Sequence, residues 1–392
     1  MSEYQFYEFR AIDKPLSKED KIQIGSWSSR SNPSNTGVVF SYNYGDFPRD
    51  EITVMEKYFD AMFYISNLGT TRLIFKFPKA LLKLNEIKQY CSEDGLKIIE
   101  KPDFILLDIS FSEEDSGRWM DGEDWLVSLI SLRDDILNED YRCLYLNWLQ
   151  NNSPSADGHW GSLNQGKLEP HVPNLLNELN GALQEFVTVF GIEKDYITVA
   201  TENSKLQYQE RPIDLAPNLD KLSEKEKTEF LLRLLDEEPF LNIKLKTRLK
   251  EFTDTNETSI KEEPRRTIGE IIQKVNKIKQ ERKNKAKIER EEKQLKKLIK
   301  LEGQEIEVWA KVPQLISEKN TKAYDQVILL LKDLKELSIY KNRFKDFCEK
   351  IELIKINNSR LSGLTSRLND AKLESTPKSL ILPQKHNDSK LH

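Results

Sequence analysis

Cysteine is scarce and long apolar runs are missing, and these two absences remove several classes of protein. The three cysteines, Cys91, Cys143 and Cys348, lie far apart in the 392-residue sequence, and no C-x-x-C pair occurs. This excludes a zinc ribbon and a dithiol redox site, and it predicts reduced thiols in a cytoplasmic protein. Apolar runs are only a few residues long, far short of the roughly 20 needed to span a bilayer, so we expect no membrane segment.

Motifs for catalysis and phosphate binding are also missing. The segment NLGTTR contains a single glycine, which excludes a phosphate-binding loop, and no G-x-S-x-G occurs. His159 and His171 share a polar loop with Asp157, but their spacing matches no zinc pattern. A pair of exposed loop histidines is the plainer interpretation. We therefore predict no cofactor, no metal and no catalytic residue.

One strand end keeps an enzymatic alternative open. Tyr44 and Asp46 lie at the end of the predicted strand 37–45. Pockets are common at the strand ends of open sheets, where Asp46 would act as a base and Tyr44 as a proton donor. A turn aspartate that follows Gly45, next to core tyrosines, explains the same residues without any chemistry.

Charge is distributed unevenly along the chain. The net charge is −5, yet residues 273–300 contain twelve Lys or Arg and four Asp or Glu, a local charge of +8 that leaves −13 elsewhere. Such asymmetry favours an interaction segment that contacts a phosphate backbone or an acidic protein surface. Because no aromatic residues interleave these charges, base stacking is not predicted, and a solvated helix also explains them. The candidate cations are Lys274, Lys277, Arg282, Lys285, Lys293 and Lys296.

The sequence pattern of residues 1–200 predicts an α+β domain with a mixed α/β sheet. Alternating apolar and aromatic residues indicate strands, and apolar residues at helical spacing indicate helices packed on the sheet. The predicted strands are 4–12, 37–45, 70–77 and 103–111. The predicted helices are 50–68, 79–91, 122–150 and 172–190.

The sequence pattern after residue 200 predicts helices, each with a narrow stripe of apolar residues. After a linker over 201–221 come a helical hairpin, 222–253, a long charged helix, 264–302, a helical bundle, 303–373, and a disordered tail, 374–392. In the hairpin, Phe230, Leu231, Leu234 and Leu235 share one helix side. A heptad seam that begins at Ile268 fails after Ile278, so only a short coiled-coil segment is expected.

Two stretches carry a resemblance to known proteins. The segments YQFYEFRAIDKP, SYNYGDF and MEKYFDAMFYISNLGTTRLIFKFP resemble a widespread bacterial family, and VWAKVPQLISEKNTKAYDQVILLLKDLKEL resembles that family's helical ending. A similar ending occurs in some bacterial proteins with a SWIM zinc finger. The ligands of that finger, C-x-C followed by C-x-H, are missing here. The resemblance therefore implies membership but no activity, cofactor or site.

Three functions remain as hypotheses. The favoured one is a non-enzymatic interaction or scaffold subunit of a bacterial multi-protein system, whose helical half docks a protein partner. It rests on the missing catalytic motifs and on an apolar seam that we expect to be uncovered at both ends of the long helix. The alternatives are nucleic-acid binding through residues 273–300 and an enzyme with a pocket near Tyr44 and Asp46.

Overall fold

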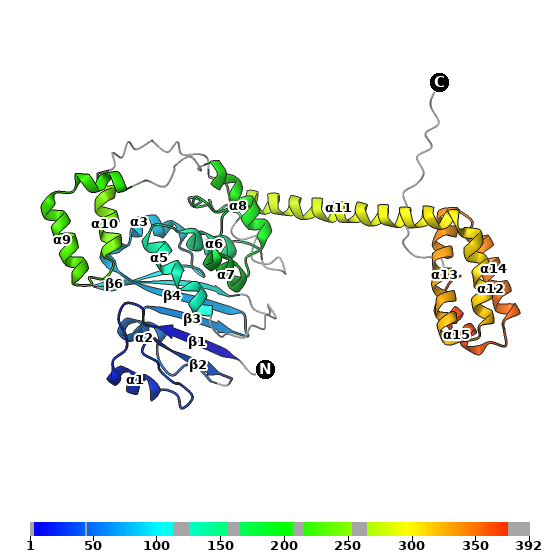
Figure 1. Ribbon diagram of the computed structural model, residues 1–392, viewed down its shortest axis with the longest axis horizontal. Helices are drawn as coiled ribbons and strands as arrows, with labels where there is room; N and C mark the ends of the chain where they lie inside the picture. The colour runs from blue at the N-terminus through cyan, green and yellow to red at the C-terminus, as the bar shows by residue number, and fades with distance from the viewer. Residues whose placement is uncertain are drawn as a thin grey trace, which may run out of the picture. The chain divides into compact units, whose positions relative to one another are not determined.

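The protein divides into two compact units, residues 1–279 and residues 280–392, each of which is described separately. The computed structural model describes residues 4–43, 45–112, 125–154, 165–206, 215–252 and 265–374 (Figure 1). The predicted α+β class, with a helical second half, is confirmed. No helix in these ranges is long and apolar enough to cross a membrane.

A six-stranded antiparallel sheet organises the first unit. Its strand order is β2-β1-β3-β4-β6-β5. Alternation places Phe6 on one face of the sheet and Tyr7 and Phe9 on the other, where each side chain joins a separate apolar cluster. The strands are β1 (Gln5–Arg10), β2 (Gly37–Tyr42), β3 (Ala61–Ser66), β4 (Thr70–Pro78), β5 (Lys97–Glu100) and β6 (Phe104–Ser112).

The predicted helix 50–68 is wrong in its second half. Helix α2 (Glu51–Tyr58) begins at Asp50, whose side chain accepts a hydrogen bond from the Thr53 N–H, and it ends at Tyr58. Residues 61–66 form β3 instead, paired on both sides with β1 and β4. The apolar run MFYI fits both the helical and the strand periodicity. Pairing with the two neighbouring strands makes it a strand. Gly69, with φ +90°, lies in the β3–β4 turn.

Helices cover both faces of the sheet. Helix α1 (Lys18–Gly25) and α2 pack on the Tyr7 and Phe9 face, and the later helices pack on the Phe6 face (Figure 1). The predicted helix 122–150 is divided, because Glu139 has φ +69°. The later elements are η1 (Lys79–Leu81), α3 (Leu84–Ile87), η2 (Lys88–Tyr90), α4 (Trp125–Leu129), α5 (Ser131–Leu137), α6 (Arg142–Asn151), α7 (Gly181–Phe190) and α8 (Lys194–Leu206).

A helical hairpin completes the first unit. After η3 (Ala216–Lys221), helices α9 (Glu224–Leu235) and α10 (Leu241–Lys250) form within the predicted hairpin range. Ile243 joins the main core, and the Lys250 ammonium lies 2.7 Å from a Glu139 carboxylate oxygen. Residues 201–206 belong to α8, so the predicted linker is helical at both ends, and residues 207–214 lie outside the described residues.

The long helix is α11 (Ile268–Gly303), close to its predicted range. Its start is held in the first unit, where the Ile268 N–H donates to the Lys167 carbonyl at 2.9 Å. The Arg266 guanidinium lies 2.8 Å from both Glu169 carboxylate oxygens, and the Tyr145 hydroxyl donates to one of them at 2.6 Å. These contacts fix the first turn of α11 against the core.

The second unit is a small helical bundle, as predicted. Helix α13 packs against α12, α14 and α15. Its core contains Val312, Val327, Leu331, Ile351 and Leu364. The elements are α12 (Glu305–Ser317), α13 (Thr321–Tyr340), α14 (Phe344–Asn357) and α15 (Ser362–Asp370). The predicted disordered tail, apart from Glu374, lies outside the described residues.

Candidate partner-binding groove

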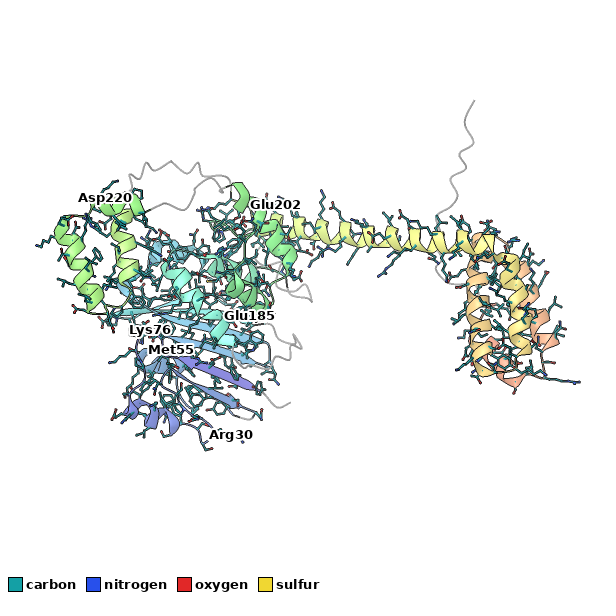
Figure 2. The ribbon with its side chains drawn as sticks, in the orientation of Figure 1. Arg30, Met55, Lys76, Glu185, Glu202 and Asp220 are labelled. Atoms are coloured by element: carbon teal, nitrogen blue, oxygen red, sulfur yellow. The ribbon has the colours of Figure 1, made fainter. Side chains whose placement is uncertain are left out.

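The predicted cations lie along α11 but do not gather at one point. The Lys274 ammonium lies 2.6 Å from a carboxylate oxygen of Glu202. Figure 2 labels Glu202 on α8. Side chains 280–290 are all exposed, including those of Arg282 and Lys285. Glu289 follows Lys285 by four residues and precedes Lys293 by four, so a carboxylate interrupts the stripe that continues to Lys296. Lys277 is exposed near the start of the helix.

The apolar seam of α11 is covered at its start and partly covered at its end by the chain itself. Ile268, Ile271 and Val275 belong to the core of the first unit. Leu298 is buried, and the neighbouring Lys297 is ion-paired with Asp333 of α13. The expectation of an uncovered seam is therefore wrong at the start of this helix, whereas at its end Leu298 is buried and Ile299 is 55% exposed. A docking surface has to be sought elsewhere.

The predicted catalytic and metal candidates do not form a site in the described part of the chain. Asp46 is exposed and accepts a hydrogen bond from the Gln5 amide at 2.9 Å. Tyr44 and His159 lie outside the described residues. His171 contributes its backbone, which accepts from the Tyr90 hydroxyl and donates to Gln89. The described residues contain no group of three or more His, Cys, Asp or Glu placed to hold a metal.

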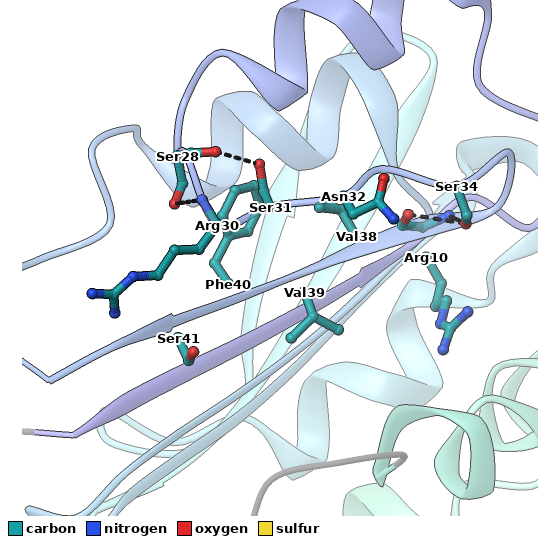
Figure 3. Close-up of a pocket in the computed structure, with 11 residues that line it drawn as sticks. Arg10, Ser28, Arg30, Ser31, Asn32, Ser34, Val38, Val39, Phe40 and Ser41 are labelled. Carbon is teal, nitrogen blue, oxygen red and sulfur yellow. Dashed lines mark hydrogen bonds between the residues drawn. The ribbon is translucent and has the colours of Figure 1, made fainter.

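A polar trough of about 350 Å³ runs along the outer edge of β2. Figure 3 shows Ser28, Arg30 and Ser31 on one side of this strand and Val39 on the other. The Arg10 guanidinium in its lining is held by Glu8 at 2.6 Å. Its lining residues include no carboxylate, histidine or cysteine, so none of them can act as a general base near neutral pH.

An apolar groove of about 470 Å³ lies between α12 and α14 in the second unit. On α12, Trp309, Val312 and Ile316 follow one another at helical spacing and form one wall. On α14, Leu353 contributes to the other wall although 58% of its surface is exposed. The other lining residues are Pro313, Ser317, Lys319, Lys350, Ile354, Asn357, Asn358 and Leu361.

The electrostatics of the groove favour an anionic occupant. The lining contains Lys319 and Lys350 and no carboxylate. The Lys350 ammonium lies 4.6 Å from the centre of the Trp309 ring, which orients the indole at the rim. Pro313 has no N–H, so the Trp309 carbonyl lacks the helical N–H that usually bonds it.

A second hollow lies on the other side of α12. It has a volume of about 370 Å³ and includes Leu315, Leu329 and Leu330. Its polar lining mixes Lys311 with Glu318, so its charge is balanced. Leu329 is 63% exposed, similar to Leu353, and therefore offers a matched control for the α12–α14 groove.

The sequence anticipated half of this groove. A helical bundle was predicted over 303–373, and within it Trp309, Val312, Leu315 and Ile316 form an apolar stripe in the sequence, of which Val312 and Ile316 are buried. Leu353, Lys350 and Pro313 were missed as lining residues. A proline within an otherwise regular helix, and apolar residues beyond those that a four-helix core needs, were the available signals. Comparison with family models, curated proteins and solved structures finds no match, so the resemblance noted above adds no support.

Proposed function

We propose that this chain is a partner-docking protein whose second unit binds an acidic amphipathic helix in the α12–α14 groove. The observation that carries the proposal is an apolar groove lined by two lysines and no carboxylate. A docked helix presents apolar residues at i, i+3, i+4 and i+7, the spacing that such grooves accept. Burial of the exposed 58% of Leu353 by the partner contributes about 1–2 kcal/mol.

The charge of the second unit supports an acidic partner. Residues 280–392 contain twenty-five Lys or Arg and seventeen Asp or Glu, a net charge of +8. Residues 1–279 contain thirty-five and forty-eight respectively, a net charge of −13. Most of this excess lies outside the bundle, because residues 301–374 contain thirteen Lys or Arg and twelve Asp or Glu. The charge of the unit therefore acts on an anionic helix during the encounter, where it raises the association rate at low salt.

The test is a selection of peptides from a displayed random library against the full chain. We expect the enriched peptides to share a helical apolar stripe flanked by Asp or Glu. Their binding should be lost in Leu353→Asp and retained in Leu329→Asp, because both leucines are exposed but only Leu353 lines the groove. Enriched peptides that bind both variants equally contradict the proposal, as does a failure to enrich helical peptides.

Nucleic-acid binding through α11 is the second candidate. It is favoured by the eleven consecutive exposed residues 280–290, which include five Lys or Arg. Fluorescence anisotropy with a labelled duplex and a labelled single strand tests it. Binding by this helix should weaken steeply with salt and be lost in Lys285→Glu/Lys293→Glu/Lys296→Glu. Affinity that does not depend on salt, or that survives this triple change, contradicts it.

A further inference from the structure

The outer edge of β2 carries backbone groups that nothing in the described part of the chain pairs. The strand register identifies them. The Thr36 carbonyl accepts from the Ala11 N–H at 2.9 Å, so the backbone groups of every second residue, counted from Thr36, face β1. The residues between them, Gly37, Val39 and Ser41, face away from the sheet. Each of these residues directs one N–H and one C=O toward the outer edge.

The chain itself closes only one end of this edge. The Ser34 N–H donates to the Gly37 carbonyl at 2.8 Å, and the Gly37 N–H donates to the Ser34 hydroxyl at 3.0 Å. Within the described residues, the backbone of Val39 and Ser41 makes no such hydrogen bond. Two donors and two acceptors therefore remain open side by side.

Strand β2 also lacks the features that usually protect the edge of a sheet. Charged residues and proline guard such edges against further strands, and the sequence GVVFSY contains neither. The opposite edge strand, β5, begins with Lys97 and ends with Glu100, which pairs with Lys79 at 3.1 Å. The sheet therefore guards one edge with charge and leaves the other, rich in strand-forming residues, open to an added strand.

The side chains beside the open edge lie on both faces of the sheet. Val39, which is 43% exposed, lies on one side of β2, and Arg30 lies on the other (Figure 3). The Arg30 guanidinium has no ion pair within the described residues, and the trough along the edge has no carboxylate in its lining. An extended peptide reaches both side chains, because its alternate side chains point to opposite faces. The backbone groups in the middle of a helix are already bonded, so a helix cannot pair with this edge.

We propose that the open edge of β2 binds an extended segment of a partner protein, which adds one further strand to the six-stranded sheet. The backbone of the segment pairs with Val39 and Ser41. Its apolar side chains pack beside Val39, and its Asp or Glu side chains bond Arg30. A second copy of β2 would bring no carboxylate to Arg30, because the strand contains none. The partner segment is therefore a different sequence in which apolar and acidic residues alternate.

Amide NMR of the full chain, with and without the synthetic peptide TVEVEVT, tests the proposal. In the free protein we expect the N–H groups of Val39 and Ser41 to exchange quickly with water. The peptide should shift their signals and slow their exchange. The N–H groups of Val38 and Phe40, which face β1, should be protected throughout.

Methylation of the peptide backbone separates strand pairing from attraction between charges. Methyl groups on the amide nitrogens of the valines block one edge of the extended peptide, and methyl groups on those of the glutamates block the other. Only one edge of the peptide can face β2. One methylated peptide should therefore lose binding and the other should keep it, and the same result for both contradicts strand pairing.

Two substitutions at Val39 separate the backbone from the side chain. Val39→Pro removes the outward N–H without removing a bond to β1, whereas Val39→Ala keeps this N–H. We expect the proline variant to weaken binding of TVEVEVT by about tenfold or more, and the alanine variant to weaken it less. Circular dichroism shows whether both variants fold. If the proline variant does not, the methylated peptides decide the question on the unaltered chain.

A charge reversal tests the role of Arg30. Arg30→Glu should lose TVEVEVT and bind the lysine peptide TVKVKVT instead, because opposite charges then meet again. Arg49→Glu, at an exposed arginine outside the trough lining, is the control and should leave the preference for TVEVEVT unchanged.

The proposal is overturned if TVEVEVT leaves the exchange of the Val39 and Ser41 amides unchanged, or if Val39→Pro and Val39→Ala bind it equally. Protection of these amides that rises with protein concentration in the absence of peptide would assign the edge to a second copy and also overturn it. Leu353→Asp should bind TVEVEVT normally, since the α12–α14 groove takes no part. Failure here is therefore distinguishable from failure of the proposed function.

Discussion

At the residue scale, one buried polar cluster holds the start of α11 in the first unit. Glu169 is only 2% exposed and receives hydrogen bonds from Arg266 and Tyr145. The Arg266 guanidinium also donates to the Val199 carbonyl at 2.9 Å. A buried carboxylate is stable only while its charge is paired and hydrogen-bonded. This cluster is therefore sensitive to the loss of any one member.

Removal of the arginine should unfold the first unit more easily. We expect Arg266→Met to lower its free energy of unfolding by about 3–5 kcal/mol, because Glu169 is left charged and buried. Denaturant unfolding of the full chain measures the change. Lys293→Met, on an exposed part of α11, is the control and should shift stability by less than about 0.5 kcal/mol. Equal stability of the two variants would show that the cluster does not hold the helix.

A second residue-scale prediction concerns Glu238 in the α9–α10 hairpin. Hydrogen bonds from Arg233 and Lys244 lower the pKa of this carboxyl from 4.5 to about 2. A depressed pKa in the folded state means that these contacts stabilise the hairpin above about pH 4.5 and are lost as the pH falls toward about 2. Carbon NMR of the Glu238 side chain measures this value.

Substitution of the partner shows whether the contact causes the shift. Lys244→Met should raise the pKa of Glu238 toward its ordinary value, whereas Lys246→Met should not, because Lys246 bonds to Asn138 instead. A wild-type Glu238 that titrates near 4.5 would contradict the hydrogen-bonded geometry.

At the element scale, α12 combines a core-facing side with a groove wall, and Pro313 lies within it. Proline is about 3 kcal/mol less favourable than alanine inside a helix, since it removes one hydrogen bond and crowds the preceding turn. Pro313 is exposed and lines the α12–α14 groove.

We expect Pro313→Ala to stabilise the second unit by about 1–3 kcal/mol and to weaken binding of a selected peptide. The alanine N–H can bond the Trp309 carbonyl, which then no longer accepts from the partner. Thermal unfolding and calorimetric titration measure the two effects. Pro313→Gly, which restores the N–H without a helix-favouring side chain, separates them. Tighter binding by the alanine variant would exclude this role for the carbonyl.

The helices and strands also show which parts of the fold can be predicted from sequence patterns. Where one periodicity dominates, as in the bundle helices around Val327 and Leu331, the elements form close to where they are predicted. At residues 61–66 the pattern suits both a helix and a strand. Pairing with β1 and β4 makes this segment a strand, and a local sequence pattern does not reveal that pairing. The groove was only partly predictable, because Leu353 becomes a lining residue through the packing of α14 beside α12.

At the scale of the whole molecule, the chain contains separate cores with no shared residue. The cores of the first unit include α11 residues up to Val275, and the core of the second unit begins at Val308. Between them, residues 280–290 have exposed side chains only. The integrity of α11 at this point is therefore not required for either core to form.

Glycines in this segment should leave both cores intact. Each glycine costs about 1 kcal/mol of helix stability relative to alanine, so Lys285→Gly/Ala286→Gly/Lys287→Gly should loosen α11 locally. Calorimetry should show both unfolding transitions at nearly unchanged temperatures, while protease cleavage increases within 280–290. Lys285→Ala/Lys287→Ala, with Ala286 unchanged, is the control. A large drop in either transition would mean that the two units depend on each other for stability.

The central claim, that the α12–α14 groove binds an acidic amphipathic helix, is tested most directly by methyl NMR of the full chain during titration with a selected peptide. The account predicts that the methyl signals of Ile316, Leu353 and Leu361 shift, and that those of Leu329 and Leu330 across α12 and of Ile271 in the first unit do not. Shifts at Leu329 and Leu330 with an unchanged Leu353 would contradict it.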